Sequence, residues 1–208
     1  MDKSTTRPHS ATRSIETKQG ILTCAQLAPL LTEQIVKIEE RIAEGAYAGV
    51  TSFEQLTLDF HREMAFALVP DWAGKWRLGQ VVVGSHTPPL SHEVPILMRQ
   101  YADDISARLA HMSESKSLIL ETLAYAEGRF LTIHPFLDFN GRVARLLLQE
   151  LLFRLDLPLV ELLPPIDTEE EQTYFKALRA ADRYDWSALI DVWKKRFEQV
   201  RFPQKSFQ

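Results

Sequence analysis

The sequence predicts a mainly α-helical protein that contains one small β element. Apolar residues recur at helical spacing along most of the 208 residues, and prolines or glycines separate the segments. Only the stretch "GQVVVG" is short, β-branched and bounded by glycines, which is typical of a strand or hairpin. The sequence has no internal repeat and no low-complexity linker. We therefore expect a single α-helical domain with an N-terminal helical extension.

The first helix is predicted to begin at Thr23, which forms a capping-box pattern with Gln26. Residues 1–20 before it are polar, and we expect them to be loose at the extreme end. The helix should continue to Gly45. Its apolar face consists of Leu27, Leu31, Ile35, Ile38 and Ile42.

A second helical segment is predicted to open with Ser52 and Gln55 and to end near Val69-Pro70. The character of the sequence then changes between Trp72 and Pro89. The "GQVVVG" strand or hairpin lies in this region, and it is the only convincing β element in the sequence.

Five later segments have helical spacing. A third long helix is marked by Leu97, Tyr101, Ile105 and Leu109, and a fourth by Ile119, Leu123, Ala126, Phe130 and Ile133. After Asn140, "GRVARLLLQELLFRL" is typical of a buried helix, which Pro158 ends. Two amphipathic segments follow, around Tyr174–Ala181 and then at Trp186, Ile190, Trp193 and Phe197.

The composition indicates an ordinary globular protein. The net charge is −4. The sequence also lacks the clustered Lys/Arg excess with which a nucleic-acid-binding protein neutralises backbone phosphates. No apolar stretch approaches the roughly 20 residues that span a bilayer, and the N-terminus has no apolar signal segment. The single cysteine, Cys24, cannot form an internal disulfide. We expect a cytoplasmic protein with neither a nucleic-acid nor a membrane partner.

The stretch "TIHPFLDFNGRVAR" gathers several reactive groups between two predicted helices. Asn140-Gly141 lies where a loop becomes a helix, and the backbone N–H groups there form a nest that binds anions, usually phosphate. Arg142 and Arg145 are three residues apart and therefore neighbours on one helical face. Two guanidinium groups beside an anion nest suit a polyphosphate.

Asp138 and His134 complete the candidate chemistry. A single carboxylate together with phosphate oxygens is a common way to hold Mg²⁺, which makes Asp138 the candidate metal ligand. A histidine titrates close to neutral pH, so His134 is suited to accept a proton from an attacking hydroxyl.

Each of these residues also has a structural interpretation. A lone histidine is more often structural, and we place five others in that class: His9, His61, His86, His92 and His111. Paired arginines on a helix are usually solvated, an Asn-Gly pair is usually a turn, and His134 and Asp138 can be unrelated loop residues. The joint order of base, carboxylate, nest and arginines favours the functional interpretation of the cluster.

The stretch "HPFLDFNGRVAR" resembles the signature of Fic-domain proteins: His, any, Phe, any, Asp or Glu, Gly or Ala, Asn, Gly, Arg, two residues, Arg. The upstream "DWAGKWRLGQVVVG", followed by Thr87-Pro88-Pro89 and "EVPILM", resembles the segment where that family places a β-hairpin flap. The likeness covers about residues 51–200. It implies a Fic-type all-α domain that transfers AMP from ATP, its co-substrate, to a hydroxyl of a target protein and releases pyrophosphate.

The resemblance implies a role for each motif residue. His134 would deprotonate a Ser, Thr or Tyr hydroxyl of the target, and Asp138 would hold Mg²⁺. Asn140 with Gly141 would cradle the phosphates, and Arg142 with Arg145 would grip the β- and γ-phosphates. Phe136 would pack inward and hold the loop. The flap, Val81, Val82, Val83, Gly84 and Ser85, would hold the target as an added strand.

Phe139 departs from the pattern, because the family usually has Gly or Ala there. A bulky residue adopts positive φ only at a cost, and a large ring at this turn could crowd the phosphate site. The choice of nucleotide and the rate are therefore in question. A kinase-like branch of the family has Lys after the Asn, and Gly141 argues against that branch.

A weaker resemblance lies in "TRSIETKQGILTCAQLAPLL". Many Fic proteins carry an inhibitory helix with Ser or Thr, three residues, Glu, then Gly or Asn. Thr12 and Glu16 fit this pattern and Thr17 does not. The implied mechanism pairs Glu16 with Arg145 and thereby blocks the γ-phosphate. The alternative is a polar tail with an incidental Thr and Glu.

The sequence leads to three segments and two classes of function. Residues 1–50 are a helical extension with an inhibitory role left open, residues 51–200 the Fic-type domain, and residues 201–208 a tail. The leading function is a Mg²⁺-dependent adenylyltransferase. The alternatives are a Fic-fold binding or regulatory module that has lost turnover through Phe139, and a transferase that uses another nucleotide. Self-modification and a homodimer stay open.

Overall fold

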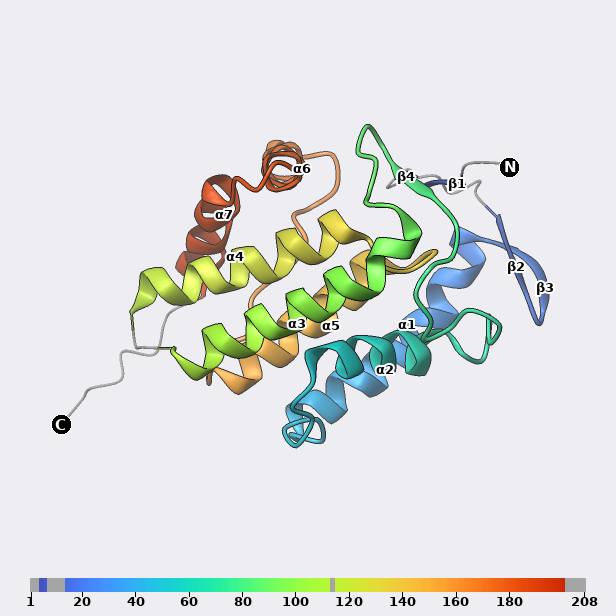
Figure 1. Ribbon diagram of the computed structural model, residues 1–208, viewed down its shortest axis with the longest axis horizontal. Helices are drawn as coiled ribbons and strands as arrows, with labels where there is room; N and C mark the ends of the chain where they lie inside the picture. Colours follow the sequence, from blue (N-terminus) through green and yellow to red (C-terminus); the bar gives the residue numbers. More distant parts are fainter. Residues whose placement is uncertain (1–3, 7–13, 113–114, 201–208) are drawn as a thin grey trace.

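The computed structural model describes residues 4–6, 14–112 and 115–200, and helices dominate this part of the chain (Figure 1). The α-helices are α1 (Cys24–Ala43), α2 (Phe53–Ala65), α3 (Val94–Ala110), α4 (Lys116–Ile133), α5 (Asn140–Arg154), α6 (Glu169–Ala181) and α7 (Ser187–Gln199). A short 3-10 helix, η1 (Ser91–Glu93), leads into α3. The mainly helical fold predicted from the sequence is confirmed.

Helix α4 forms the centre of the fold. Every residue of 122–130 is buried, because this helix is apolar around most of its circumference and contacts α3, α5, α6 and α7. Close approach depends on Gly128, where an added Cβ would lie 2.6 Å from Trp186 and 2.9 Å from Ala181. Helices α1 and α2 pack against α5 from the other side, and all seven helices contribute to one continuous hydrophobic core.

The starts of the first two helices follow the predicted capping. The Thr23 N–H donates to Gln26 Oε1 at 2.8 Å, and the Gln26 N–H donates back to Thr23 Oγ1 at 3.3 Å. Ser52 caps α2 through the Gln55 N–H at 3.2 Å. The predicted end of the second helix is wrong, because α2 stops at Ala65 and the chain turns before Pro70.

The expectation of a single β element is also wrong. Besides β4 (Val81–Val83), the structure has β1 (Ser4–Thr6), β2 (Ser14–Thr17) and β3 (Gly20–Thr23). β2 and β3 form an antiparallel hairpin directly before α1, where the sequence analysis expected a loose polar segment. Its turn is closed by Gly20 at φ 100° and by the Thr17 hydroxyl, which donates to the Gly20 carbonyl. A three- or four-residue strand leaves too little periodicity to be found from sequence alone.

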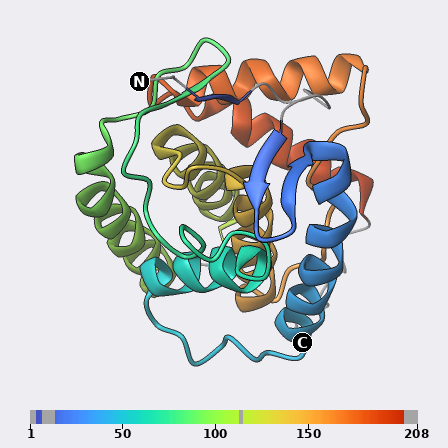
Figure 2. The same ribbon diagram turned by 90° about the vertical axis from the view of Figure 1, so that its right-hand side faces the viewer.

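Three loops meet at one end of the helical bundle (Figure 2). Helix α4 ends there, α5 begins there, and the segment around β4 lies across them. The β2–β3 hairpin lies at the same end, where the Lys18 N–H donates to the Leu68 carbonyl at 2.9 Å. This end of the molecule therefore carries the predicted motif.

Candidate functional site

His134 is the residue at which α4 stops. It adopts a left-handed conformation, φ 51° and ψ 62°, and its N–H donates to the Phe130 carbonyl at 2.9 Å. Its side chain is 7% exposed. Nδ1 lies 3.4 Å from the Leu131 carbonyl, which can only accept, so Nδ1 carries the proton and Nε2 is left as the acceptor.

Burial keeps the His134 ring neutral. It lowers the pKa of His134 from 6.5 to about 3, because few water molecules reach the charged form, and the neighbouring Arg77 acts in the same direction. A neutral imidazole can accept a proton at neutral pH. Its weak basicity also means that nearby negative charge would be needed to raise its proton affinity during a reaction.

The loop between His134 and α5 is held by side chains rather than by secondary structure. The Asn140 side chain accepts from the Phe136 N–H and donates to the Phe136 carbonyl, each at 2.9 Å. Asp138 Oδ1 accepts from the Phe139 N–H at 2.7 Å, and Asp138 is 8% exposed. The Asn140 amide therefore shapes the loop, which leaves only its backbone N–H to contribute to the anion nest.

Phe136 packs inward as expected. It is fully buried and stacks on His61, with ring centroids 3.8 Å apart. His61 Nδ1 accepts from the Gly74 N–H at 2.8 Å, and burial lowers the pKa of His61 to about 4. His61 is thus the structural histidine that the sequence indicated.

Phe139 adopts the positive φ that we expected a bulky residue to avoid. Its φ is 64° at the residue that precedes α5. The ring is 5% exposed and lies 5.5 Å from the Trp72 ring, centroid to centroid, while the Arg142 guanidinium lies 5.5 Å from its centroid. Packing against these groups offsets the backbone cost and turns the ring into the core.

The start of α5 offers donors and positive charge together. The backbone N–H groups of Asn140 and Gly141 have no acceptor within the described ranges, because the first helical bonds are made by Arg142 and Val143. Arg142 and Arg145 are half-buried, and burial lowers the pKa of each guanidinium. Neither arginine forms an ion pair with any residue that the structure describes. Such a site favours an anion.

The predicted flap is a strand followed by a tight turn. Val83 and His86 donate backbone N–H groups to each other's carbonyls, each at 2.9 Å, around Gly84 at φ 59°. Val81 is buried, and Gly84 and Ser85 are exposed.

Four residues around the flap were missed by the sequence analysis. Arg77, 2% exposed, donates from Nε to the His134 carbonyl at 2.8 Å. His86, which we had classed as structural, has Nε2 3.0 Å from the Thr132 carbonyl and Nδ1 3.5 Å from Asp182. Arg179 pairs with Asp182 at 3.0 Å. Arg179 and Asp182 lie three residues apart at the end of α6. The contacts of Arg77 and His86 join distant parts of the chain, so no local spacing links them to the motif.

The edge of the flap is occupied by the chain's own N-terminal strand. β1 runs parallel to β4 with Ser4 opposite Val81, Thr5 opposite Val82 and Thr6 opposite Val83 (Figure 1). Val83 directs its backbone groups toward His86. Since backbone groups alternate along a strand, those of Val82 face the edge where β1 lies.

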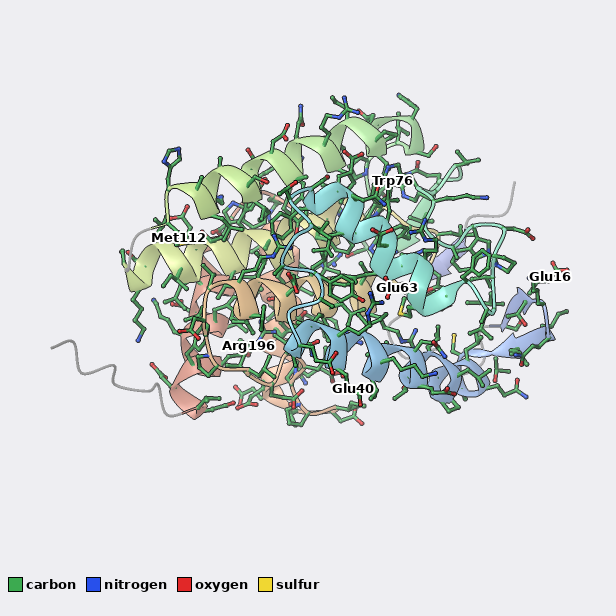
Figure 3. The ribbon with its side chains drawn as sticks, turned by 90° about the horizontal axis from the view of Figure 1, so that it is seen from below. Glu16, Glu40, Glu63, Trp76, Met112 and Arg196 are labelled. Atoms are coloured by element: carbon green, nitrogen blue, oxygen red, sulfur yellow. The ribbon has the colours of Figure 1, made fainter. Side chains whose placement is uncertain are left out.

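The structure does not bring Glu16 to the arginines. Thr12 lies outside the described residues. Glu16 is exposed on β2, at the outer edge of the hairpin (Figure 3), and it forms no ion pair with Arg145 in the part of the chain that the structure covers.

Within the described ranges, no three His, Cys, Asp or Glu side chains gather as a metal-binding group. Asp138 is thus the one carboxylate of the motif, which fits a Mg²⁺ ion whose other ligands are phosphate oxygens and water. In the same ranges, no helix is both long and apolar enough to cross a membrane.

Comparisons with known proteins find similar sequences and similar folds. A sequence model of the Fic/DOC family matches residues 29–152. The protein adenylyltransferase Fic of Drosophila persimilis is 33% identical over 129 residues, which are 62% of this chain and 24% of that protein. The corresponding protein of Aedes aegypti is 31% identical over 128 residues, with the same shares. The chain thus spans about a quarter of the length of these relatives.

Solved structures show the same fold. The BepC protein of Bartonella tribocorum, with bound AMPPNP, has a TM-score of 0.65 at 14% identity and covers 90% of this chain and 94% of its own. The Fic-1 protein of C. elegans has a TM-score of 0.62 at 22% identity and covers 86% of this chain and 56% of its own.

Proposed function

This chain belongs to the Fic/DOC family, and we propose that it is a protein adenylyltransferase that moves AMP from ATP to a hydroxyl of a target protein. One observation carries the proposal most directly. Two half-buried arginines, which form no ion pair with any described residue, lie beside backbone N–H groups at the start of α5, within the same short motif as a buried neutral histidine. The relatives named protein adenylyltransferase Fic support the same activity.

The proton transfer follows from the state of His134. The target hydroxyl oxygen attacks the α-phosphorus of ATP, its proton passes to His134 Nε2, and the bond to the β-phosphate breaks to release pyrophosphate. The pKa of His134 is about 3 without ligand. The negative charge of bound phosphates would raise that pKa and make the ring a better base when substrate is in place.

The phosphates would be held by the start of α5. The N–H groups of Asn140 and Gly141, together with Arg142, would bind the phosphates nearest the loop. Arg145, one turn further on, would reach the outer phosphates. Asp138 would hold Mg²⁺, which neutralises phosphate charge when bound. ATP use is consistent with the AMPPNP bound to the Bartonella tribocorum protein.

The flap would hold the target as an added strand. The position of β1 on β4 places a segment with three hydroxyl residues, Ser4–Thr6, on that strand. We therefore include self-modification of Ser4–Thr6 in the proposed function, together with targets in trans. The cytoplasmic location favoured by the composition stays a prediction.

The rival function is a binding or regulatory module without turnover. Its main support was the crowding expected from Phe139. That ring lies in the core against Trp72, which removes the observation that favoured the rival and leaves the transferase as the better supported function.

The position of the radioactive label in ATP separates these functions. Purified chain with Mg²⁺ and ATP labelled at the α-phosphate should acquire covalent label, and ATP labelled at the γ-phosphate should transfer none. Label from the γ-phosphate would indicate phosphoryl transfer instead. ATP binding by calorimetry without label from either position, on this chain or on added lysate proteins, would support the binding module and contradict the proposal.

A further inference from the structure

We propose that Arg77 is a positioning residue that fixes the flap relative to His134. The inference rests on the proposed function, in which the flap holds the target and His134 accepts its proton. Arg77 donates to the His134 carbonyl and also to the Gly79 and Pro89 carbonyls, which lie before and after the flap. Within the described residues its side chain forms no hydrogen bond to strand β4 or to the imidazole ring, and it acts through the backbone that carries them.

The charge of Arg77 is unusual for a residue of the core. It is 2% exposed, and within the described ranges it has no carboxylate partner. Two other arginines are buried: Arg196 donates to Glu127 at 2.7 Å, and Arg129 donates to the Tyr184 hydroxyl at 3.1 Å and lies over its ring. Burying a cation without an opposite charge is costly, and only hydrogen bonds to carbonyls offset that cost here. The guanidinium of Arg77 is therefore committed to backbone carbonyls, whose positions it fixes.

On the catalytic side, Arg77 holds the end of α4. Its Nε donates to the His134 carbonyl at 2.8 Å, and its Nη2 lies 3.4 Å from the Ile133 carbonyl. Its backbone N–H donates to the Pro135 carbonyl at 2.9 Å. His134 is in the left-handed region, where the direction of its carbonyl and of its side chain depends on what holds the backbone. Arg77 supplies that restraint.

On the flap side, the same guanidinium joins the two stems of the flap. Nη1 donates to the Gly79 carbonyl at 3.1 Å, before β4, and Nη2 donates to the Pro89 carbonyl at 2.5 Å, after the turn. Gln80 closes the base with a bond to the Pro88 carbonyl at 2.8 Å. One planar group thus spans both stems and the histidine.

Such a connection matters because proton transfer depends on position. A target hydroxyl held by the flap must lie within hydrogen-bond distance of Nε2, and an error of about 1 Å can reduce a rate by about 10². Lysine carries the same charge at a single nitrogen, so it cannot span carbonyls on both sides as the fork of an arginine does. Arg77→Lys is therefore the informative change.

The first test is amide hydrogen exchange of the full chain without nucleotide. Arg77→Lys should increase exchange by about tenfold or more at Val83 and His86 in the flap and at His134, and should leave the amides of α7 unchanged, because only local opening is affected. A matched control is Arg154→Lys. Arg154 also donates to two carbonyls, those of Tyr47 and Val50, at 3.0 and 2.9 Å, and to Glu150.

The second test is the initial rate of self-labelling from α-labelled ATP. Arg77→Lys should lower the rate at saturating ATP by about 10² while the Kd for ATP stays nearly unchanged. Arg154→Lys should change neither the labelling rate nor the Kd for ATP. If Arg77, like Arg154, served only the stability of the fold, both substitutions would reduce the labelling rate in parallel with stability.

Several results would overturn the inference. They are unchanged exchange at Val83 and His86 in Arg77→Lys, loosening of α7 to the same extent as the flap, or failure of both Arg77→Lys and Arg77→Gln to fold. If wild-type protein transfers no label at all, the proposed function fails, and the exchange measurement still decides whether Arg77 connects the flap to His134.

Discussion

The pKa of His134 decides what this side chain can do before and after ATP binds. At neutral pH the buried ring is unprotonated, as a general base must be. His134→Ala should reduce label transfer by about 10²–10⁴, because a general base acts in the transition state. The Kd for ATP by calorimetry should change little. His92→Ala, at an exposed position of η1, is the control, and undiminished transfer in His134→Ala would remove the assignment.

Phe139 combines an unfavourable backbone with favourable packing. Phe139→Gly should lower the free energy of unfolding, because losing a buried ring costs about 3–5 kcal/mol and relief of the left-handed conformation returns about 1–2 kcal/mol. Phe139→Ala should be less stable still, since alanine keeps the backbone cost. Urea unfolding measures both. The preference for ATP over UTP should not change, and a large change would show that the ring shapes the nucleotide site.

At the scale of elements, the pairing of β1 with β4 determines what reaches the flap. In this register the backbone groups of Val82 face the residues that flank Thr5. Thr6→Pro should therefore disrupt the pairing, whereas Thr5→Pro should be tolerated, because an edge strand accepts proline where its N–H faces outward. Amide exchange at Val82 should rise only in Thr6→Pro.

The same pair of variants tests self-modification. Label mapped by mass spectrometry to residues 4–6 should fall in Thr6→Pro and persist in Thr5→Pro, although each variant loses one hydroxyl. Equal labelling of this segment in both variants would show that β1 is not presented by the flap.

The position of the β2–β3 hairpin determines what the inhibitory hypothesis requires. Glu16 is exposed on β2, so the hairpin must move before Glu16 can reach Arg145. In the observed arrangement, Glu16→Gly should change the initial labelling rate by no more than about twofold, as surface substitutions usually do. A strong increase that disappears in the Glu16→Gly, Arg145→Ala double variant would instead establish the inhibitory pair.

At the scale of the whole molecule, two buried histidines make folding depend on pH. The pKa values of His61 and His134 are lowered to about 4 and about 3, while the unfolded chain binds protons near 6.5. The unfolded state therefore binds more protons, and stability falls progressively as pH falls from about 6.5 toward 3. Above pH 6.5 this contribution is fully present.

The slope of stability against pH tests this linkage. Between pH 4.5 and 6, His134→Ala should show a slope smaller than that of wild type by up to about 1.4 kcal/mol per pH unit, because one proton fewer is taken up on unfolding. Urea unfolding at several pH values measures the slopes, with His92→Ala as the control. Equal slopes for wild type and His134→Ala would mean that His134 titrates in the folded state as it does in the unfolded chain.

The sequence alone determined the helical order and which groups of the motif lie together. Helical periodicity and the caps at Thr23 and Ser52 are local properties, so they predict elements without knowledge of the fold. The groups from His134 to Arg145 lie within one short loop and the first two turns of one helix, which makes their proximity a consequence of covalent connection. The inward packing of Phe136 could be inferred for the same reason.

Only the tertiary structure decided which distant groups meet at the motif. Arg77 reaches the His134 carbonyl across 57 positions of sequence, β1 lies beside β4, and Glu16 lies on a hairpin away from Arg145. Even the positive φ of Phe139 depends on Trp72, which supplies the packing that offsets the backbone cost. Such contacts arise when separate elements bury surface against one another, and no spacing within a single segment encodes them.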